Sequence, residues 1–360
     1  MYFLRLITMD LSQINTKLII ILLLIFVASI FYTFNAKYSG IYPEKSLDNI
    51  SNNSINADLH SGEPVKNNLD NIDNDPIDAK IYPGDSVQNA INTVSSGGTV
   101  IVYPGLYKEN LVVDKPLKVI SSNEGGSAYA SIQAADPEKD VFHITADNVT
   151  ISGFNITGSQ DKAGIYYSGS GGNITRNKLS YNNYGVYFND SKVNILENNE
   201  VNNNSLGIYL RNSNNNQLKS NNITGVGIFV GLDNNATGIY LEDSDNNKLM
   251  SNTIAKLWDG VNFTESSNNE LNNNSILHNY FSLSLINSNN NKVLNNTIVR
   301  RGYSFSVVLA NSQNNTLQGN NKNLNTDFKI YYSFKSTNNT LEGELYTSNE
   351  QGTGGVFRVI

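Results

Sequence analysis

A unit of about 22 residues recurs from Asn148 to Leu341, and this repeat restricts the possible folds more than any other feature of the chain. Each unit contains a short run such as GIYL, which begins at Gly207, and a serine lies six residues after the start of the run. These serines are Ser170, Ser191, Ser213, Ser244, Ser266, Ser288, Ser312 and Ser336. An asparagine lies three residues beyond every serine, from Asn173 to Asn339. Repeats of this length and regularity are typical of a solenoid of stacked units.

Side chains alternate in character within each run, as they do in a β-strand. In GIYL, Ile208 and Leu210 point to one side and Tyr209 points to the other. A second strand follows the asparagine, and its apolar column is Leu196, Leu218, Leu249, Leu271, Val293, Leu317 and Leu341. Helical spacing is absent, which excludes a leucine-rich repeat, and Gly and Asn between the strands suit corners with positive φ. The sequence therefore predicts an all-β fold, a parallel β-helix with two or three short strands per turn.

A further column of asparagines lies at the end of the second strand, three residues after each leucine. Its members are Asn199, Asn221, Asn252, Asn274, Asn296 and Asn320. Equivalent residues of successive coils in a β-helix are one strand spacing, ~4.8 Å, apart. Identical amides at that spacing can hydrogen-bond from coil to coil and satisfy inward-facing corners. We expect this column to be structural rather than catalytic.

The beginning of the chain predicts export. Leu18 to Phe34 contains no charged residue and is preceded by Arg5 and Lys17. A helix of this length spans ~25 Å, between the lengths of a secretory signal and of a membrane anchor. Within residues 1–36 we favour an uncleaved transmembrane anchor over a cleaved signal peptide, because no small-residue cleavage site follows. The positive residues on the amino side place the rest of the chain outside the membrane.

The rest of the chain divides into a linker and a folded domain. Residues 37–80 are polar, acidic and rich in Asn, and they have too few apolar residues to fold alone. The β-helix domain covers residues 81–360. Near its start, Asp85 or Ser86 can cap a short amphipathic helix that begins at Val87, and we expect this helix to cover the open end of the solenoid. The chain has no cysteine, which excludes disulfides and thiolate metal sites.

Two kinds of segment resemble a known family. The start of the domain, YPGDSVQNAINTVSSGGTVIVYPG from Tyr82, and coils such as NNKLMSNTI resemble the NosD-like right-handed β-helix proteins, which are built from PbH1 repeats and include archaeal cell-surface proteins. The resemblance extends from Ile81 to about Leu341 and implies a right-handed parallel β-helix. For function it implies either a role in copper-site maturation, as for the periplasmic NosD proteins linked to nitrous oxide reductase, or carbohydrate binding and sugar hydrolysis.

Copper handling requires soft or imidazole ligands. Outside the amino-terminal region the domain offers only His143, His278 and Met250. The two histidines are about six coils apart in the predicted solenoid, or ~29 Å along its axis, so they cannot share an ion. We therefore expect no metal site formed by these residues, and the copper function remains an alternative implied by the family.

A polysaccharide lyase, epimerase or glycoside hydrolase is a second alternative. Such chemistry needs two nearby carboxylates or a carboxylate cluster that holds Ca²⁺. The weak catalytic candidates are Asp233, Glu242 and Asp243, and the candidate Ca²⁺ ligands are Glu242, Asp243 and Asp245. They lie at or near an insertion between Gly225 and Thr237, and insertions in solenoids often form the binding face. However, no Asp-x-Asp pair recurs on adjacent coils, which favours a solvated turn with ordinary acidic residues.

A surface module that binds glycan or builds the cell envelope is the favoured interpretation. One outward position on four successive coils is occupied by Tyr166, Tyr187, Tyr209 and Tyr240. The positions two residues further on are Ser168, Asn189, Arg211 and Glu242. Aromatic rings with polar neighbours suit sugar binding, although tyrosines on exposed strands also pack on one another. Arg211 and Glu242 are expected ~5 Å apart and able to pair.

The sequence therefore predicts an exported cell-surface β-helix protein with a structural or glycan-binding role, tethered to the membrane by its amino-terminal helix. Its expected partner is a cell-envelope polysaccharide. Nucleic acid is not expected, because the net charge is −7 and Lys and Arg form no stripe.

Overall fold

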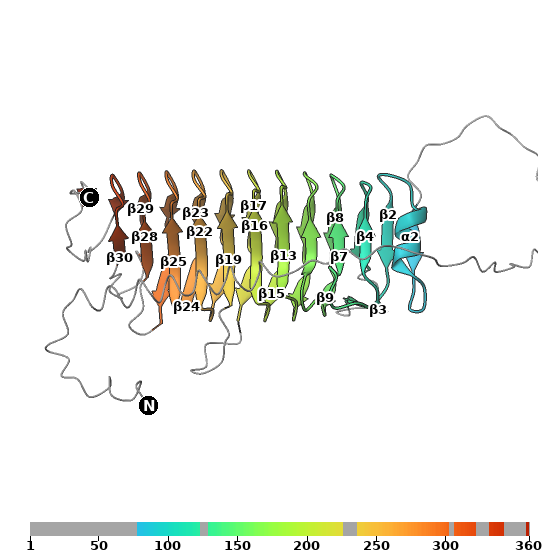
Figure 1. Cartoon of the computed structure of the whole chain (residues 1–360). Coiled ribbons are helices and arrows are strands. Elements are labelled where there is room, and N and C mark those ends of the chain that lie inside the picture. The colour runs from blue at the N-terminus through green and yellow to red at the C-terminus, as the bar shows by residue number, and fades with distance from the viewer. Residues whose placement is uncertain are drawn as a thin grey trace, which may run out of the picture. The chain divides into compact units, whose positions relative to one another are not determined.

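The computed structural model divides the chain into two units, Met1–Asp70 and Asn71–Ile360. The residues that the structure describes all belong to the second unit, and they are 78–122, 129–225, 236–301, 306–321, 331–341 and 358–359. In this unit short strands stack coil upon coil (Figure 1) and form three parallel sheets. The predicted all-β parallel β-helix is confirmed, with three strands in each regular coil rather than two.

Each sheet takes one strand from each coil. The thirteen-stranded sheet consists of β1 (Ala79–Ile81), β2 (Thr99–Val102), β5 (Lys118–Ser121), β8 (Thr150–Ser152), β11 (Asn173–Thr175), β14 (Ile195–Glu197), β17 (Gln217–Lys219), β20 (Lys248–Met250), β23 (Glu270–Asn272), β26 (Lys292–Leu294), β29 (Thr316–Gln318), β31 (Thr340–Leu341) and β32 (Arg358–Val359). The ten-stranded sheet consists of β4 (Leu111–Val113), β7 (Phe142–Ile144), β10 (Ala163–Tyr167), β13 (Tyr184–Asn189), β16 (Leu206–Arg211), β19 (Thr237–Glu242), β22 (Asp259–Thr264), β25 (Phe281–Ile286), β28 (Val307–Ala310) and β30 (Tyr331–Phe334). The nine-stranded sheet consists of β3 (Gly105–Lys108), β6 (Ala130–Gln133), β9 (Asn155–Thr157), β12 (Lys178–Ser180), β15 (Glu200–Asn202), β18 (Asn222–Thr224), β21 (Thr253–Ala255), β24 (Ser275–Asn279) and β27 (Thr297–Arg300).

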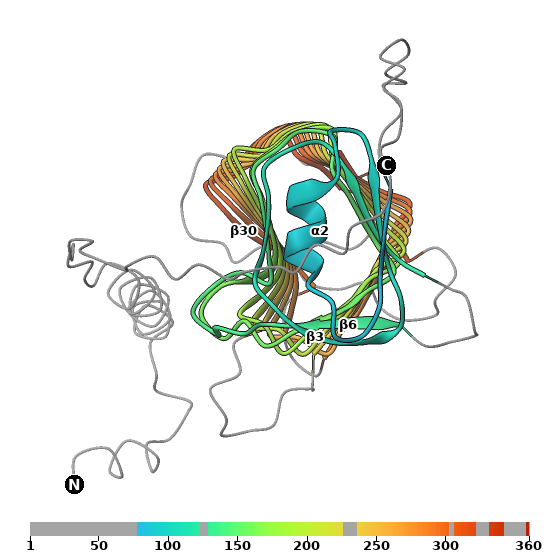
Figure 2. The same ribbon diagram turned by 90° about the vertical axis from the view of Figure 1, so that its right-hand side faces the viewer.

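The core is a set of columns in which equivalent side chains of successive coils lie on one another. Ile208 pairs in register with Val186 on one side and Ile239 on the other, and all three are fully buried. Leu218 pairs in the same way with Leu196 and Leu249 in the thirteen-stranded sheet. Viewed along the coils, the three sheets enclose this apolar interior (Figure 2). The alternation in the sequence thus sets which side chains form the core.

The predicted asparagine column is a continuous hydrogen-bonded ladder. The Asn199 backbone N–H and side-chain Nδ2 both donate to Asn221 Oδ1, at 3.0 and 2.9 Å. Asn221 repeats the pattern with Asn252, and its Nδ2 also donates to the Leu196 carbonyl at 2.8 Å. Each buried amide therefore satisfies backbone groups of the neighbouring coil at a corner that water does not reach.

The column of asparagines that follow the serines needs one correction. From Asn194 to Asn339 these residues form a second buried ladder, in which, for example, Asn194 N–H donates to Asn216 Oδ1 at 2.9 Å. Asn173 does not belong to it, because it pairs in register with Ile195, and Gly172 occupies the ladder position instead. The reason is a corner one residue shorter in this coil. The buried Tyr167 fills the space there, and its hydroxyl accepts from the Val149 N–H at 3.1 Å.

One short helix, α2 (Val87–Thr93), lies across the end of the coils formed by the first strands (Figure 2). Its N-cap is Ser86, whose hydroxyl accepts from the Asn89 N–H at 3.2 Å. Val87, Ala90 and Ile91 are buried, which is the apolar face expected from their spacing. The helix thereby removes apolar core at this end from solvent.

The candidate anchor, Leu18 to Phe34, lies outside the described residues. In the part of the chain that the structure does describe, no helix is long and apolar enough to cross a membrane.

Candidate functional site

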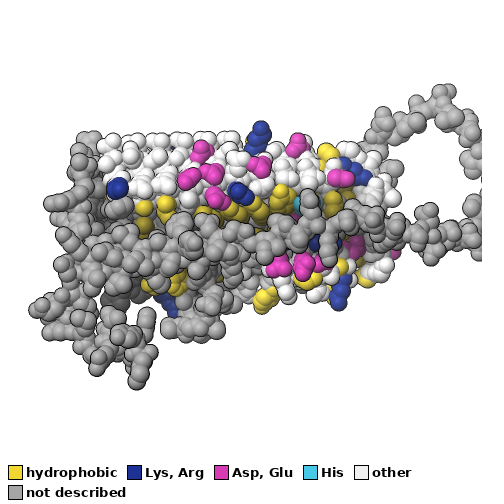
Figure 3. Space-filling view, viewed as in Figure 1, with side chains coloured by type: hydrophobic (Ala, Val, Ile, Leu, Met, Phe, Trp, Pro, Cys, Tyr) yellow, Lys and Arg dark blue, Asp and Glu magenta, His cyan; other side chains and the backbone are white. Residues whose placement is uncertain are grey.

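The outward face of the ten-stranded sheet carries the four predicted tyrosines. The register places Tyr166 beside Tyr187, Tyr187 beside Tyr209, and Tyr209 beside Tyr240. We call these four residues the tyrosine column. Hydrophobic side chains form a band along this face with charged side chains next to it (Figure 3). The same position is held by Asn262 and then Ser284 on the following coils, where the column ends as predicted.

The rings of the column face one another rather than solvent. The Tyr187 and Tyr209 ring centroids are 4.7 Å apart with planes inclined by 13°, and those of Tyr209 and Tyr240 are 5.2 Å apart at 5°. Tyr166 meets Tyr187 edge to face at 5.4 Å. Aromatic pairs at these separations stabilise each other. Because the ring faces are occupied by neighbouring rings, the hydroxyls and ring edges are the parts available to a ligand.

His143 continues the column by one coil and was missed as part of the site by the sequence reasoning. It pairs in register with Tyr166, and the two rings stack with centroids 4.7 Å apart and planes 5° apart. Its Nδ1 lies 2.9 Å from Asp140 Oδ2. The alternation in VFHIT indicated the outward direction of His143, but the irregular spacing of the early coils hid its alignment with Tyr166.

Polar side chains join the column into one network. The Tyr209 hydroxyl donates to Glu242 Oε2, and Arg211 Nε lies 3.9 Å from the same oxygen, so the predicted pairing of Arg211 with Glu242 is confirmed. The Tyr187 hydroxyl donates to Asn189 Oδ1 at 3.1 Å. Asn189 in turn donates through Nδ2 to the Tyr166 hydroxyl at 3.3 Å. The side chain of Arg211 is 57% exposed, so its guanidinium borders the solvent.

The surroundings keep these hydroxyls protonated. Burial raises the pKa of Tyr187 and of Tyr240, and burial together with the Glu242 carboxylate raises the pKa of Tyr209. The hydrogen bond with Tyr187 raises the pKa of the Arg211 guanidinium. At neutral pH Tyr187, Tyr209 and Tyr240 therefore present uncharged hydroxyls.

The acidic residues proposed for catalysis or calcium binding form no metal-binding cluster in the part of the chain that the structure describes. Asp243 is a corner residue with φ 48°, and Asp245 Oδ1 accepts from the Ser267 N–H at 2.6 Å. Glu242 is already bound by the tyrosine column, and Asp233 lies outside the described residues. In the described ranges no three His, Cys, Asp or Glu side chains lie close enough to hold a metal ion. Asp259 is not one of these candidates. It is half-buried, and burial raises the pKa of its carboxyl to about 7.

The candidate copper ligands are similarly dispersed. His143 belongs to β7 in the ten-stranded sheet, Met250 to β20 in the thirteen-stranded sheet, and His278 to β24 in the nine-stranded sheet. The strand order places β7 and β24 about six coils apart, as the sequence indicated. His143 is also engaged by Asp140 and Tyr166. The described residues thus do not supply the ligand set that copper prefers.

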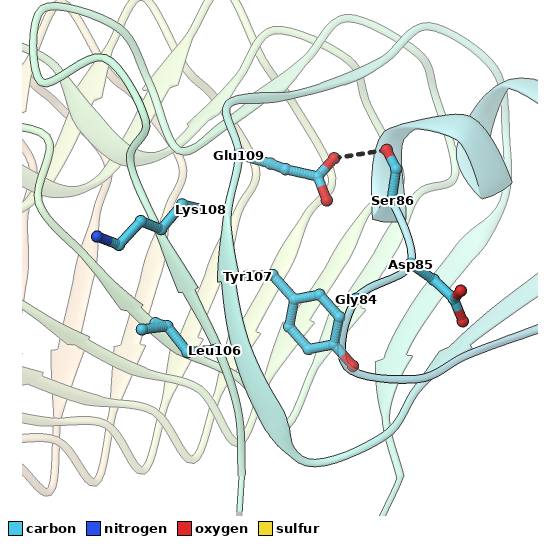
Figure 4. A pocket seen from close by; sticks show the side chains of 7 residues that line it. All are labelled: Gly84, Asp85, Ser86, Leu106, Tyr107, Lys108 and Glu109. Atoms are coloured by element: carbon cyan, nitrogen blue, oxygen red, sulfur yellow. Dashed lines mark hydrogen bonds between the residues drawn. The ribbon is translucent and has the colours of Figure 1, made fainter.

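A pocket of about 370 Å³ lies beside α2 (Figure 4). The carboxylate and hydroxyl groups in its wall already have partners within the fold. Glu109 accepts from the Ser86 hydroxyl at 3.0 Å and from the Val87 N–H at 2.8 Å, and the Tyr107 hydroxyl donates to the Tyr103 carbonyl at 2.8 Å. This pocket is therefore part of the helix cap rather than a binding site.

Two known protein families together match most of the β-helix domain. The pattern of the family described as "Periplasmic copper-binding protein (NosD)" matches residues 91–283, and that described as "Right handed beta helix region" matches residues 231–357. A cell surface glycoprotein of Methanothermus fervidus is 41% identical over 88 residues, which are 24% of this chain and 14% of that protein. The chain thus matches only a small part of this relative's length.

Solved structures share the architecture at low sequence identity. DFA-IIIase from Arthrobacter chlorophenolicus A6 is 15% identical, with a TM-score of 0.59 over 75% of this chain and 82% of the enzyme. The enzymatically active domain of tailspike protein 2 of bacteriophage CBA120 is 11% identical, with a TM-score of 0.52 over 74% of this chain and 47% of that chain. At these identities the likeness concerns the fold alone.

Proposed function

The chain belongs to the NosD family of right-handed β-helix proteins, and from this membership and the outward face of the ten-stranded sheet we propose that it is an exported cell-surface protein that binds glycan along the tyrosine column. The observation that carries the proposal is the network of Tyr166, Tyr187, Tyr209 and Tyr240 with Asn189, Arg211 and Glu242. Polar groups held in place by mutual hydrogen bonds lose little conformational entropy when a ligand binds.

The surface location is supported by the glycoprotein relative and by the periplasmic setting in the family description. In the proposed arrangement, the uncharged stretch from Leu18 to Phe34 holds the protein at the membrane. Residues 37–80 form the linker, and residues 81–360 form the β-helix domain that carries the glycan site. A glycan of the cell envelope is the proposed partner.

The proposed binding mode uses hydroxyl groups and ring edges. The ring faces between Tyr187 and Tyr209 and between Tyr209 and Tyr240 are covered, so a sugar ring cannot lie flat on them without separating the stack. A polysaccharide running along the column would instead hydrogen-bond to Asn189 and Arg211, which lie beside the rings on adjacent strands. Both DFA-IIIase and the tailspike domain are enzymes by their descriptions, but of the acidic candidates that the structure describes, Glu242 is engaged by Tyr209 and Arg211, which does not favour catalysis here.

Binding of the full-length protein to a panel of acidic and neutral polysaccharides tests the proposal. We expect saturable binding of at least one polysaccharide without release of fragments. Arg211→Ala removes the exposed donor next to the column, and Tyr209→Phe removes one hydroxyl while it keeps the ring stack. Each is expected to weaken binding roughly three- to tenfold, the effect of losing one hydrogen bond worth about 0.5–1.5 kcal/mol.

Tyr181→Ala is the matched control, because Tyr181 is 66% exposed and lies outside the tyrosine column. Equal weakening by this variant, or no polysaccharide binding at all, would reject the site and leave an envelope role without ligand. Release of oligosaccharides that is lost in Glu242→Gln or Asp243→Asn would reject the non-enzymatic role and favour a polysaccharide-active enzyme.

A further inference from the structure

A second pocket lies where the thirteen-stranded sheet turns into the nine-stranded sheet, over the first coils. Its volume is about 560 Å³, within the ~300–1,000 Å³ typical of small-molecule sites. The lining residues are Ile101, Ile120, Ser121, Ser122, Tyr129, Ser152, Gly153 and Arg176. None of them belongs to the tyrosine column, so a ligand here is independent of the function proposed above.

The corner at this pocket has an unusual residue. In every described coil from Gly153 onward the corner residue has a positive φ, and from Gly153 to Asn295 its N–H donates to the next coil. The successive corner residues are Gly153, Arg176, Asn198, Ser220, Ser251, Asn273, Asn295 and Gly319. Glycine, asparagine and serine are small, whereas Arg176 holds a long side chain at φ 55°. Arg176 is thus the one long side chain in this column, although corners elsewhere in the solenoid hold large residues at positive φ as well, such as Lys256 and Glu265.

Arg176 is also a cation without an acidic partner. Its neighbours Lys178 and Lys219 pair with Glu200 and Glu197, at 3.4 and 2.9 Å. Among the described residues, no carboxylate lies within ion-pair distance of the Arg176 guanidinium, which makes one long hydrogen bond of 3.4 Å to Ser152 Oγ. Gly153 precedes Arg176 in the corner column and has no side chain, so the guanidinium borders an open space. Most of its five donors are left for a ligand.

The remaining lining combines hydroxyl groups with apolar surface. Ser121 and Ser152 are more than nine-tenths buried, and their Oγ atoms accept from the Ala130 N–H at 3.0 Å and from Thr175 Oγ1 at 3.1 Å. Both hydroxyls keep a fixed position in the wall of the pocket. Ile101 and Ile120 point outward from adjacent strands and are half-buried. A sugar ring has this same mixture of hydroxyl groups and apolar C–H surface, and a guanidinium binds a carboxylate through two parallel hydrogen bonds.

We propose that this pocket binds a sugar acid, a pyranose that carries a carboxylate, with the carboxylate on Arg176 and the ring over Ile101 and Ile120 beside the serine hydroxyls. The site differs from the tyrosine column in sheet, in charge and in ligand. A neutral sugar lacks the group that Arg176 recognises, and a simple inorganic anion lacks the ring that fills the pocket.

Calorimetric titration of the full-length protein with oligogalacturonate tests the proposal, with a neutral glucose oligosaccharide of equal length and inorganic sulfate as comparison ligands. We expect oligogalacturonate to bind at least tenfold more tightly than either. Arg176→Asn is the decisive variant, because asparagine occupies this corner at Asn198, Asn273 and Asn295. It is expected to fold with an unchanged or higher melting temperature and to lose about tenfold or more in affinity for oligogalacturonate.

Lys192→Ala is the control, since Lys192 is an exposed cation outside the pocket, and it should bind oligogalacturonate like the wild type. Oligogalacturonate binding that survives Arg176→Asn would overturn the site. Sulfate binding as tight as oligogalacturonate would overturn the sugar assignment, and no binding of oligogalacturonate by the wild type would overturn the proposal as a whole. Tyr209→Phe should leave this binding unchanged, which separates the two sites.

Discussion

The buried asparagine amides stabilise the coils because each one meets several backbone and side-chain groups at once. Asn221 accepts through Oδ1 from the N–H and the Nδ2 of Asn199, and it donates through Nδ2 to the Leu196 carbonyl and to Asn252. Alanine at this position would leave donors and an acceptor without partners in a corner that is 1% exposed. A buried polar group that loses its partner costs about 1–3 kcal/mol.

We therefore expect Asn221→Ala to lower the free energy of unfolding by roughly 2–4 kcal/mol, the sum of more than one such loss. Urea unfolding followed by circular dichroism measures it. The adjacent Asn222 is exposed on β18, so Asn222→Ala should change the stability by less than about 0.5 kcal/mol. Similar effects of the two substitutions would show that the ladder contributes little beyond ordinary burial.

Residue-level expectations from the sequence succeed where the repeat is regular. The repeat predicted the register of Tyr187, Tyr209 and Tyr240, because one outward position recurs every coil. It also indicated that these tyrosines could pack on one another, but not the face-to-face geometry, since χ angles depend on neighbours across coils that a one-dimensional pattern does not describe. The sequence wrongly placed Asn173 in the asparagine ladder. In the structure the hydroxyl of the buried Tyr167 takes the place of the ladder amide in this coil, which residue spacing alone does not reveal.

At the scale of the elements, α2 depends on a contact that the local sequence does not predict. Ser86 is a recognisable N-cap, but the carboxylate of Glu109, more than twenty residues away, accepts from the Ser86 hydroxyl and from the N–H groups of Val87 and Gln88 (Figure 4). A seven-residue helix is too short to be stable by itself, so this cap and its buried face hold it in place.

Glu109→Ala should therefore release the start of α2 and lower stability by about 1–2 kcal/mol, as for the loss of an N-cap. Hydrogen exchange should become faster in α2 and β1 and remain slow in the later coils, because each coil contacts only its neighbours. Lys108→Ala, at an exposed neighbouring position, is the control and should leave exchange unchanged. Uniformly faster exchange along the whole domain would contradict a local capping role.

At the scale of the whole domain, stability comes from contacts between successive coils. Strands pair in register with the coil before and the coil after, and the described pairings join no distant coils. A domain of this kind behaves as a one-dimensional array in which local defects stay local. This property follows from the repeat. It explains why the sequence predicted the architecture and its capping helix well, while the irregular first coils, the Glu109 contact of that helix and the Arg176 pocket required the structure.

Glycines recur near the first residue of successive strands in the ten-stranded sheet. Substitution of one of these glycines tests whether a defect in one coil stays local. A Cβ at Gly207 would lie 2.6 Å from the Gly238 carbonyl oxygen of the next coil and 2.7 Å from Ile223 Cγ2. Gly207→Ala should thus push adjacent coils apart and destabilise the domain by about 1–3 kcal/mol, the cost of overpacking a close contact. Hydrogen exchange should accelerate in β13, β16 and β19 while α2 and β26 stay protected. Ser282 is the control, because it occupies the equivalent position two coils beyond Gly238 and its buried hydroxyl has no partner among the described residues. Ser282→Ala should therefore be neutral or slightly stabilising. If Gly207→Ala instead unfolds the whole domain in a single transition without a local opening, the coils are coupled over the full length of the solenoid and the one-dimensional description is wrong.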